Sequence, residues 1–185
     1  MTKILTLILL ISIVANGQTT TKQESRNNHL QTIIDWKLLD QANYSIQYPQ
    51  TWELNQSGQM GLSFIFLSPL ESDKDKFREN VNLLIQDLSG RNIDLNKYTE
   101  ISEGQIKTLV TNSNLIESKR MKNERGEYHK IIYSGDQGIY HLKYEQYYWV
   151  LNEKAFVLTF TSEQGKFTDY KEIGEKILNS FIIKK

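Results

Sequence analysis

The chain has 185 residues, and its 22 basic side chains are balanced by 22 acidic ones, so its formal net charge is zero. This balance argues against a nucleic-acid-binding protein and against a polybasic membrane-surface protein, because both need concentrated positive charge. The chain has no cysteine, which excludes disulfide bonds and cysteine nucleophiles.

The first 17 residues have the features of a secretory signal peptide. Lys3 precedes an apolar run from Ile4 to Val14, and the small residues Ala15 and Gly17 follow the run. A run of this length is too short to span a hydrocarbon core of roughly 30 Å. We therefore expect cleavage near Gly17, no transmembrane anchor after cleavage, and an exported protein that is periplasmic or secreted.

Residues 18–29 are predicted to form a flexible tether. The stretch from Thr19 to Asn28 holds Thr, Asn and charged residues but no large apolar side chain, so burial could not offset the entropy of ordering it. The remaining residues, 30–185, are enough for a single domain with a hydrophobic core and no disulfide bonds.

The sequence pattern predicts four strands in the first half of this domain, and one of them, residues 61–68, is predominantly apolar rather than alternating. The longest of them spans residues 77–89, where Val81, Leu83 and Ile85 point one way while Asn82 and Gln86 point the other. The other three are residues 32–39, residues 44–48 beyond a turn at 40–43, and residues 61–68 before a charged loop at 69–76.

Two amphipathic helices are predicted around a second block of strands. The first helix spans residues 94–112, with Asp94 as its N-cap and apolar residues every three or four positions from Leu95 to Leu109. The second spans residues 167–184. Between them lie four strands in meander order, 114–122, 127–134, 139–152 and 154–162, with turns at 123–126, 135–138 and 152–154.

This order of elements predicts an α+β fold with a mostly antiparallel β-sheet and helices that cover its faces. The short connections suit hairpins better than parallel crossovers. No glycine-rich loop joins a strand to a helix, so a doubly wound nucleotide-binding fold is not expected.

The histidines offer one candidate metal site. His129 and His141 lie on strands predicted to be neighbours, and Glu127 and Glu145 lie close to them in the sequence. If all four shared one face of the sheet, they could supply a metal with two imidazoles and a carboxylate, although their spacing matches no closed zinc pattern.

No motif for catalysis is present. The chain lacks a G-x-S-x-G elbow, and Ser118 and Ser134 lie near a histidine without a visible third partner. The paired carboxylates of the loop at 69–76 are explained by full solvation. We predict no catalytic residue and no cofactor, and therefore a protein that is not an enzyme.

The strand at 139–152 carries aromatic residues on both faces. Tyr140, Tyr144 and Tyr148 share one face, and Tyr147 and Trp149 share the other. If helices cover both faces, every ring is part of the core. If one face is open, Tyr147 and Trp149 are candidates for binding a protein or another ligand.

The stretch YSIQYPQTWEL breaks a strand pattern with Pro49 and then places Trp52. A strand, Tyr-Pro, a short turn and a Trp that starts the next strand form an opening hairpin that resembles the PsbP-like superfamily, which includes photosystem II extrinsic subunits and DcrB-like exported bacterial proteins. The order of three further motifs agrees: F-x-x-N-V-N-L at 77–83, A-F-V-L-T-F at 155–160, and a terminal helix that opens with Phe167.

The resemblance implies an αβα sandwich in a non-catalytic accessory or binding protein, whose partner would be a protein or an envelope component. It also draws attention to Trp52, which would close one end of the core, and to Arg78 and Asn80 on the long strand. Arg78 and Asn80 have either a structural role or a role in ligand binding. The candidate binding residues are Trp52, Arg78, Asn80, Tyr147 and Trp149.

Overall fold

The computed structural model describes residues 35–184. The predicted signal peptide, the tether and the first residues of the domain lie outside the described residues. Within 35–184, no helix combines the length and the apolar character needed to cross a membrane.

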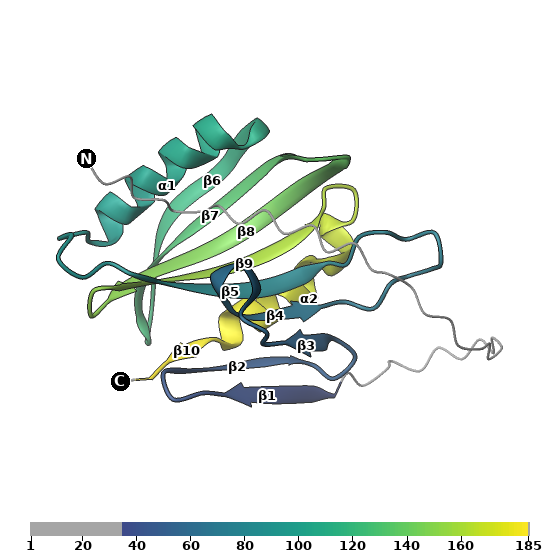
Figure 1. Ribbon diagram of the computed structural model, residues 1–185, viewed down its shortest axis with the longest axis horizontal. Coiled ribbons are helices and arrows are strands. Elements are labelled where there is room, and N and C mark those ends of the chain that lie inside the picture. Colours follow the sequence, from purple (N-terminus) through teal and green to yellow (C-terminus); the bar gives the residue numbers. More distant parts are fainter. Residues whose placement is uncertain (1–34, 185) are drawn as a thin grey trace.

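A seven-stranded antiparallel sheet is the centre of the domain (Figure 1). Its strand order is β3-β4-β5-β9-β8-β7-β6, so β5 and β9, which are far apart in the sequence, pair along their length. The bounds are β3 Glu53–Asn55, β4 Leu62–Leu67, β5 Asn80–Asp87, β6 Thr111–Asn123, β7 Gly126–Gln137, β8 Tyr140–Leu151 and β9 Lys154–Glu163.

A smaller sheet lies beside it and joins the two ends of the described chain. Its order is β1-β2-β10, with β1 Trp36–Asp40, β2 Tyr44–Pro49 and β10 Ile182–Ile183, and β2 pairs with both neighbours in antiparallel register. A short 3-10 turn, η1, spans Gln59–Gly61.

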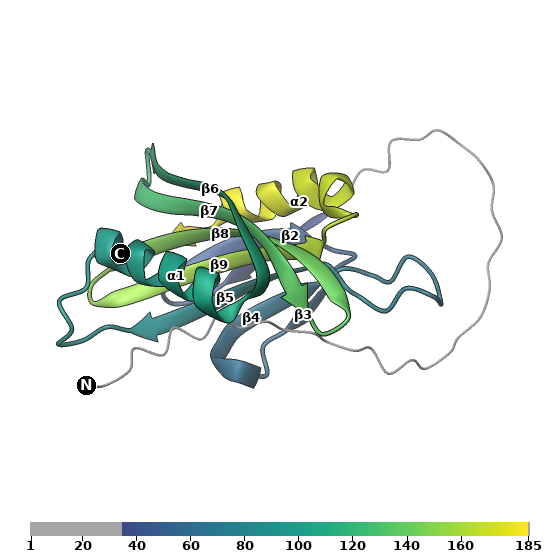
Figure 2. The ribbon, with the colours of Figure 1, turned by 90° about the horizontal axis from the view of Figure 1, so that it is seen from above.

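Two helices pack on opposite faces of the large sheet (Figures 1 and 2). Helix α1, Leu95–Leu109, covers one core cluster that includes Tyr148. Helix α2, Phe167–Ser180, lies with β2 over a second cluster that includes Tyr147. The alternation along β8 therefore supplies both cores, and the predicted α+β class is confirmed.

Several boundaries differ from the prediction. Helix α2 ends at Ser180 rather than 184, because Phe181 is extended and the two residues after it pair with β2. Periodicity could not reveal this end, since it depends on a partner strand more than 130 positions away in the sequence. The long strand begins at Asn80 rather than 77, and α1 ends at Leu109 rather than 112.

The predicted turn at 135–138 is also wrong in part, because Gly135, Asp136 and Gln137 belong to β7. Gly135 is needed for packing, since a Cβ there would lie 2.2 Å from Cγ1 of Val110. The tight turn after β8 is as predicted, and both Asn152 and Glu153 have positive φ.

The Tyr-Pro-x-x-Trp stretch does not form the predicted opening hairpin. Strand β2 pairs with β1 and β10, whereas β3 pairs with β4 in the other sheet. The turn closed by the hydrogen bond from Trp52 N to the carbonyl oxygen of Pro49, 2.9 Å long, therefore passes the chain from the small sheet to the large one.

Candidate binding groove

The structure does not bring the candidate metal ligands together. His129 lies opposite Tyr148 and His141 opposite Asp136, so the two histidines are separated by about 23 Å along the strands at 3.3 Å per residue. They also face opposite sides of the sheet, because His129 shares the α1 face with Tyr148 while His141 is an odd-numbered residue of β8, like Tyr147 on the α2 face.

Glu127 and Glu145, the two candidate carboxylate ligands, form ion pairs with lysines instead. Glu145 is fully buried, and its Oε1 lies 3.1 Å from Nζ of Lys130. Glu127 is exposed and lies 3.8 Å from Nζ of Lys122. No group of three or more potential ligands occurs among residues 35–184, so the metal-site hypothesis is not supported.

Ser118 does acquire two polar partners that the sequence did not reveal. Its Oγ lies 2.7 Å from Nε2 of His129 and donates a hydrogen bond to Glu103 on α1. In a hydrolytic triad the carboxylate orients the imidazole, but here it contacts the hydroxyl, and Nδ1 of His129 is buried without a partner in the described part of the chain. These contacts join α1 to the sheet. They lack the carboxylate–imidazole contact by which a catalytic triad activates its serine.

Arg78 and Asn80 have internal partners. The Arg78 guanidinium donates to the carbonyl oxygens of Ser68 at 2.5 Å and Leu67 at 3.1 Å, and it pairs with Glu53 at 2.7 Å. Asn80 donates to the carbonyl oxygen of Arg78 at 3.2 Å. These contacts fasten β3 and the end of β4 to β5, which favours the structural alternative for both residues. Trp52 is 5% exposed and packs in the core.

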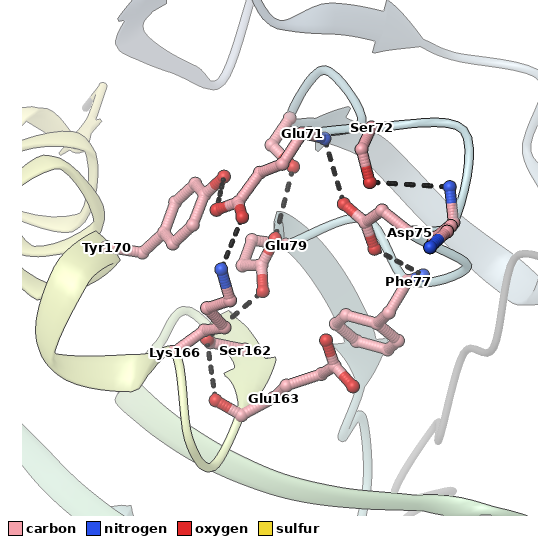
Figure 3. A network of polar contacts seen from close by, with 11 residues as sticks. Glu71, Ser72, Asp75, Phe77, Glu79, Ser162, Glu163, Lys166 and Tyr170 are labelled. Atoms are coloured by element: carbon pink, nitrogen blue, oxygen red, sulfur yellow. Dashed lines mark hydrogen bonds and ion pairs between the residues drawn. The ribbon is translucent and has the colours of Figure 1, made fainter.

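A polar network joins the loop between β4 and β5 to the start of α2 (Figure 3). Glu71 accepts hydrogen bonds from Lys166 and, at 3.0 Å, from the Tyr170 hydroxyl. Glu79 lies beside this network and is 2% exposed, and the hydroxyls of Ser68 and Ser162 each donate a hydrogen bond of 3.4 Å to its carboxylate. Burial raises the pKa of Glu79.

Tyr147 and Trp149 line a groove at the other end of α2. The groove has a volume of about 670 Å³, within the range of about 300–1,000 Å³ that is usual for small-molecule sites. Its lining comes from the β6–β7 and β8–β9 turns, from the ends of the adjoining strands and from the chain after α2. The two turns and β10 lie close together at the lower left of Figure 1.

The walls of the groove are aromatic. Trp149 is only partly buried, and its ring centroid lies 5.4 Å from that of Tyr128, 6.0 Å from Tyr147 and 5.3 Å from Phe181. Leu151 and Ile182, which also line the groove, are 46% and 41% exposed. Trp149 makes no side-chain hydrogen bond to any residue of 35–184, and its ring forms part of the groove lining.

The charged groups of the groove are all cationic. Arg125, Lys154 and Lys184 line it, and no aspartate or glutamate does. Lys184 is paired with Asp40 at 2.6 Å. Arg125 and Lys154 form no ion pair with any described residue. Asp87 lies opposite Lys154 in the β5–β9 ladder, and its pKa is lowered mainly by hydrogen bonds from Ser89 and to a smaller extent by the charge of Lys154.

The sequence predicted two of these groove residues, Tyr147 and Trp149, and did not single out Arg125, Lys154 or the segment 182–183. Arg125 lies in a basic run that suggests a solvated hairpin end. No local signal identifies it, because the groove forms only when that hairpin packs against the end of α2. The binding role of Tyr147 and Trp149 stays a prediction.

Comparison with known proteins finds similar folds among solved structures. No family model matches the chain, and no curated protein matches its sequence. LpqN of Mycobacterium tuberculosis, a protein involved in cell envelope biogenesis, matches in structure with a TM-score of 0.63 at 12% identity, covering 83% of this chain and 93% of that one.

Two further solved structures are similar. PA94 of Pseudomonas aeruginosa has a TM-score of 0.59 at 10% identity, covering 81% of this chain and 98% of its own. The cyanobacterial PsbP of Synechocystis sp. PCC 6803, CyanoP, has a TM-score of 0.57 at 13% identity, covering 86% of this chain and 98% of its own. Because these sequence identities are low, the matches establish a similarity of fold and nothing more. They confirm the resemblance at that level: the chain has the PsbP-like fold.

Proposed function

We propose that this chain is an exported, non-enzymatic accessory protein that binds a component of the cell envelope in the groove beside Trp149. One observation carries the proposal. Helix α2 packs on β9 and β5 and ends at Ser180, and Trp149 at the end of β8 stays only partly buried as a wall of the groove. Large rings that remain accessible in a concave site are typical of ligand binding.

The fold and the sequence support the rest of the proposal. LpqN, which shares the fold, is involved in cell envelope biogenesis. The predicted signal peptide at residues 1–17 favours export. A non-enzymatic role is favoured because Ser118, His129 and Glu103 lack the triad order and the groove lining contains no histidine, serine or carboxylate.

Native mass spectrometry after exposure to an envelope extract tests this function. The mature chain from Gln18 is incubated with an organic-solvent extract of the envelope, purified again and sprayed under native conditions. Trp149→Ala is compared with Trp36→Ala, a matched substitution, because Trp36 lies under Nζ of Lys176, 4.4 Å away, and does not line the groove.

We expect an added mass on the wild-type chain and on Trp36→Ala, and its loss from Trp149→Ala. Equal retention by both variants would place binding outside the groove. No retained component in any of the three proteins would contradict the proposed function.

A further inference from the structure

The groove combines an apolar wall with two cations, Arg125 and Lys154, that form no ion pair with any described residue. We propose that its ligand is a single-chain amphiphile with a monoanionic headgroup, such as a fatty carboxylate, whose chain lies on the aromatic wall and whose headgroup meets Arg125 and Lys154. This inference rests on the proposed function and names the class of ligand.

The apolar part of the ligand follows from the lining. Ten of the groove residues are aliphatic or aromatic, and they come from both sheets and from α2. They are Ile85, Tyr128, Tyr147, Trp149, Leu151, Phe156, Leu178, Phe181, Ile182 and Ile183. Burying an apolar chain here removes area from water on both ligand and protein, at about 25 cal/mol per Å². A volume of about 670 Å³ suits a ligand of small-molecule size rather than a folded partner.

The sign of the headgroup follows from the charges. The whole molecule is neutral, yet the groove holds three cations and no carboxylate. Because Lys184 already has Asp40 as a partner, Arg125 and Lys154 are the two cations left for a ligand. They flank the end of β8 from neighbouring strands, since Arg125 directly precedes β7 and Lys154 begins β9.

The geometry at Arg125 favours one negative charge over two. Its Nη1 donates to the carbonyl oxygens of Asn179 at 2.8 Å and Phe181 at 3.3 Å. Nε and Nη2 remain, and they form the fork that fits a carboxylate bidentately. The Asn179 carbonyl belongs to the last turn of α2, at the negative end of the helix, and the Phe181 carbonyl lies directly after it. Both oxygens carry partial negative charge, so they disfavour a second charge such as that of a phosphate monoester dianion.

Isothermal titration calorimetry with four probes of equal chain length tests the headgroup. The mature chain is titrated with decanoate, decyl phosphate, decyl maltoside and decyltrimethylammonium, each below its critical micelle concentration. We expect decanoate to bind most tightly, decyl phosphate and the neutral maltoside less tightly, and the cation least. The affinity for decanoate should fall with added salt, whereas that for the maltoside should not.

Matched variants locate the headgroup. Lys154→Gln should weaken decanoate binding about threefold to tenfold and leave the maltoside unchanged. Arg125→Gln should weaken decanoate more than the maltoside, because it removes the charge and also loosens the groove wall after α2. Arg120→Gln is the control, because Arg120 lies on the same hairpin as Arg125 but contacts Asn96 and does not line the groove. Lys154 makes no side-chain hydrogen bond to the described residues, so its variant tests the charge without disturbing α2.

The outcomes separate the ligand class from the function. Equal affinity for decanoate and decyl maltoside, unaffected by both variants, would overturn the anionic headgroup while the groove remained a binding site. Tighter binding of decyl phosphate than of decanoate would overturn the preference for a single charge. If no probe bound but the extract component were still retained through Trp149, the amphiphile inference would fail and the proposed function would stand.

Discussion

Gly174 and Gly104, one in each helix, differ in whether the surrounding structure has room for a side chain. A Cβ at Gly174 of α2 would lie 2.8 Å from the ring of Phe160, whereas a Cβ at Gly104 of α1 would have no atom within 4 Å. Gly174→Ala should therefore lower the free energy of unfolding by about 1–3 kcal/mol. Gly104→Ala should raise it by about 0.5–1 kcal/mol, since alanine restricts the unfolded chain. Urea unfolding of both variants measures the difference, and equal effects would contradict the close approach of α2 to β9.

Glu79 predicts a pH effect on stability. Burial raises its pKa in the folded state, so the folded protein binds more protons than the unfolded one once the pH exceeds the ordinary pKa of a glutamate, about 4.3. Its contribution to stability is therefore greatest at low pH and is lost as the pH rises towards the folded-state pKa.

Glu79→Gln removes this titration while keeping the shape of the side chain. We expect the variant to be more stable than the wild type at pH 7, with the two converging towards pH 4. Glu71→Gln is a useful comparison, because Lys166 and Tyr170 lower the pKa of Glu71 and the sign of its effect is reversed. Thermal melts between pH 4 and 8 provide the measurement, and a Glu79→Gln variant less stable at pH 7 would refute the argument.

At the scale of elements, the β6–β7 hairpin contacts the end of α2 and stabilises it through hydrogen bonds. The two hydrogen bonds from Arg125 to the carbonyl oxygens of Asn179 and Phe181 join the β6–β7 turn to the segment that leads into β10. In Arg125→Gln, amide exchange over residues 179–184 should speed up about threefold to tenfold, and exchange over residues 167–177 should not change. Arg120→Gln is the control and should leave exchange in both regions as in the wild type. Unchanged exchange over residues 179–184 in Arg125→Gln would show that the pairing of β10 with β2 is enough to hold these residues in place.

At the scale of the molecule, one sheet serves two cores. Ile106 of α1 and Ile177 of α2 are both fully buried, in clusters on opposite faces of the same strands. Ile106→Ala and Ile177→Ala should each cost about 2–5 kcal/mol, and their effects should add because the sites share no contact.

Both variants should nevertheless unfold in one transition, because β8 and β9 contribute side chains to both clusters. Calorimetry and circular dichroism of the two single variants and the double variant check this. Two separate transitions in either single variant would mean that the faces fold as independent units.

The sequence by itself determined the α+β class, the antiparallel meander from residue 114 to 162 and the N-cap at Asp94, because alternation, turn residues and caps act over a few neighbours. It also determined which face of β8 each aromatic occupies, since a strand has a period of two. The signal peptide and tether remain predictions from composition.

Only the tertiary structure decided the rest. The end of α2 at Ser180, the passage of the chain between sheets at Pro49–Trp52 and the separation of His129 from His141 depend on strand pairing and register. The groove depends on the same long-range contacts, because Arg125, Lys154 and Ile182 come together through pairings between distant segments. No local sequence pattern predicts that these three residues lie close together, because within its own segment each looks like a common turn or strand residue.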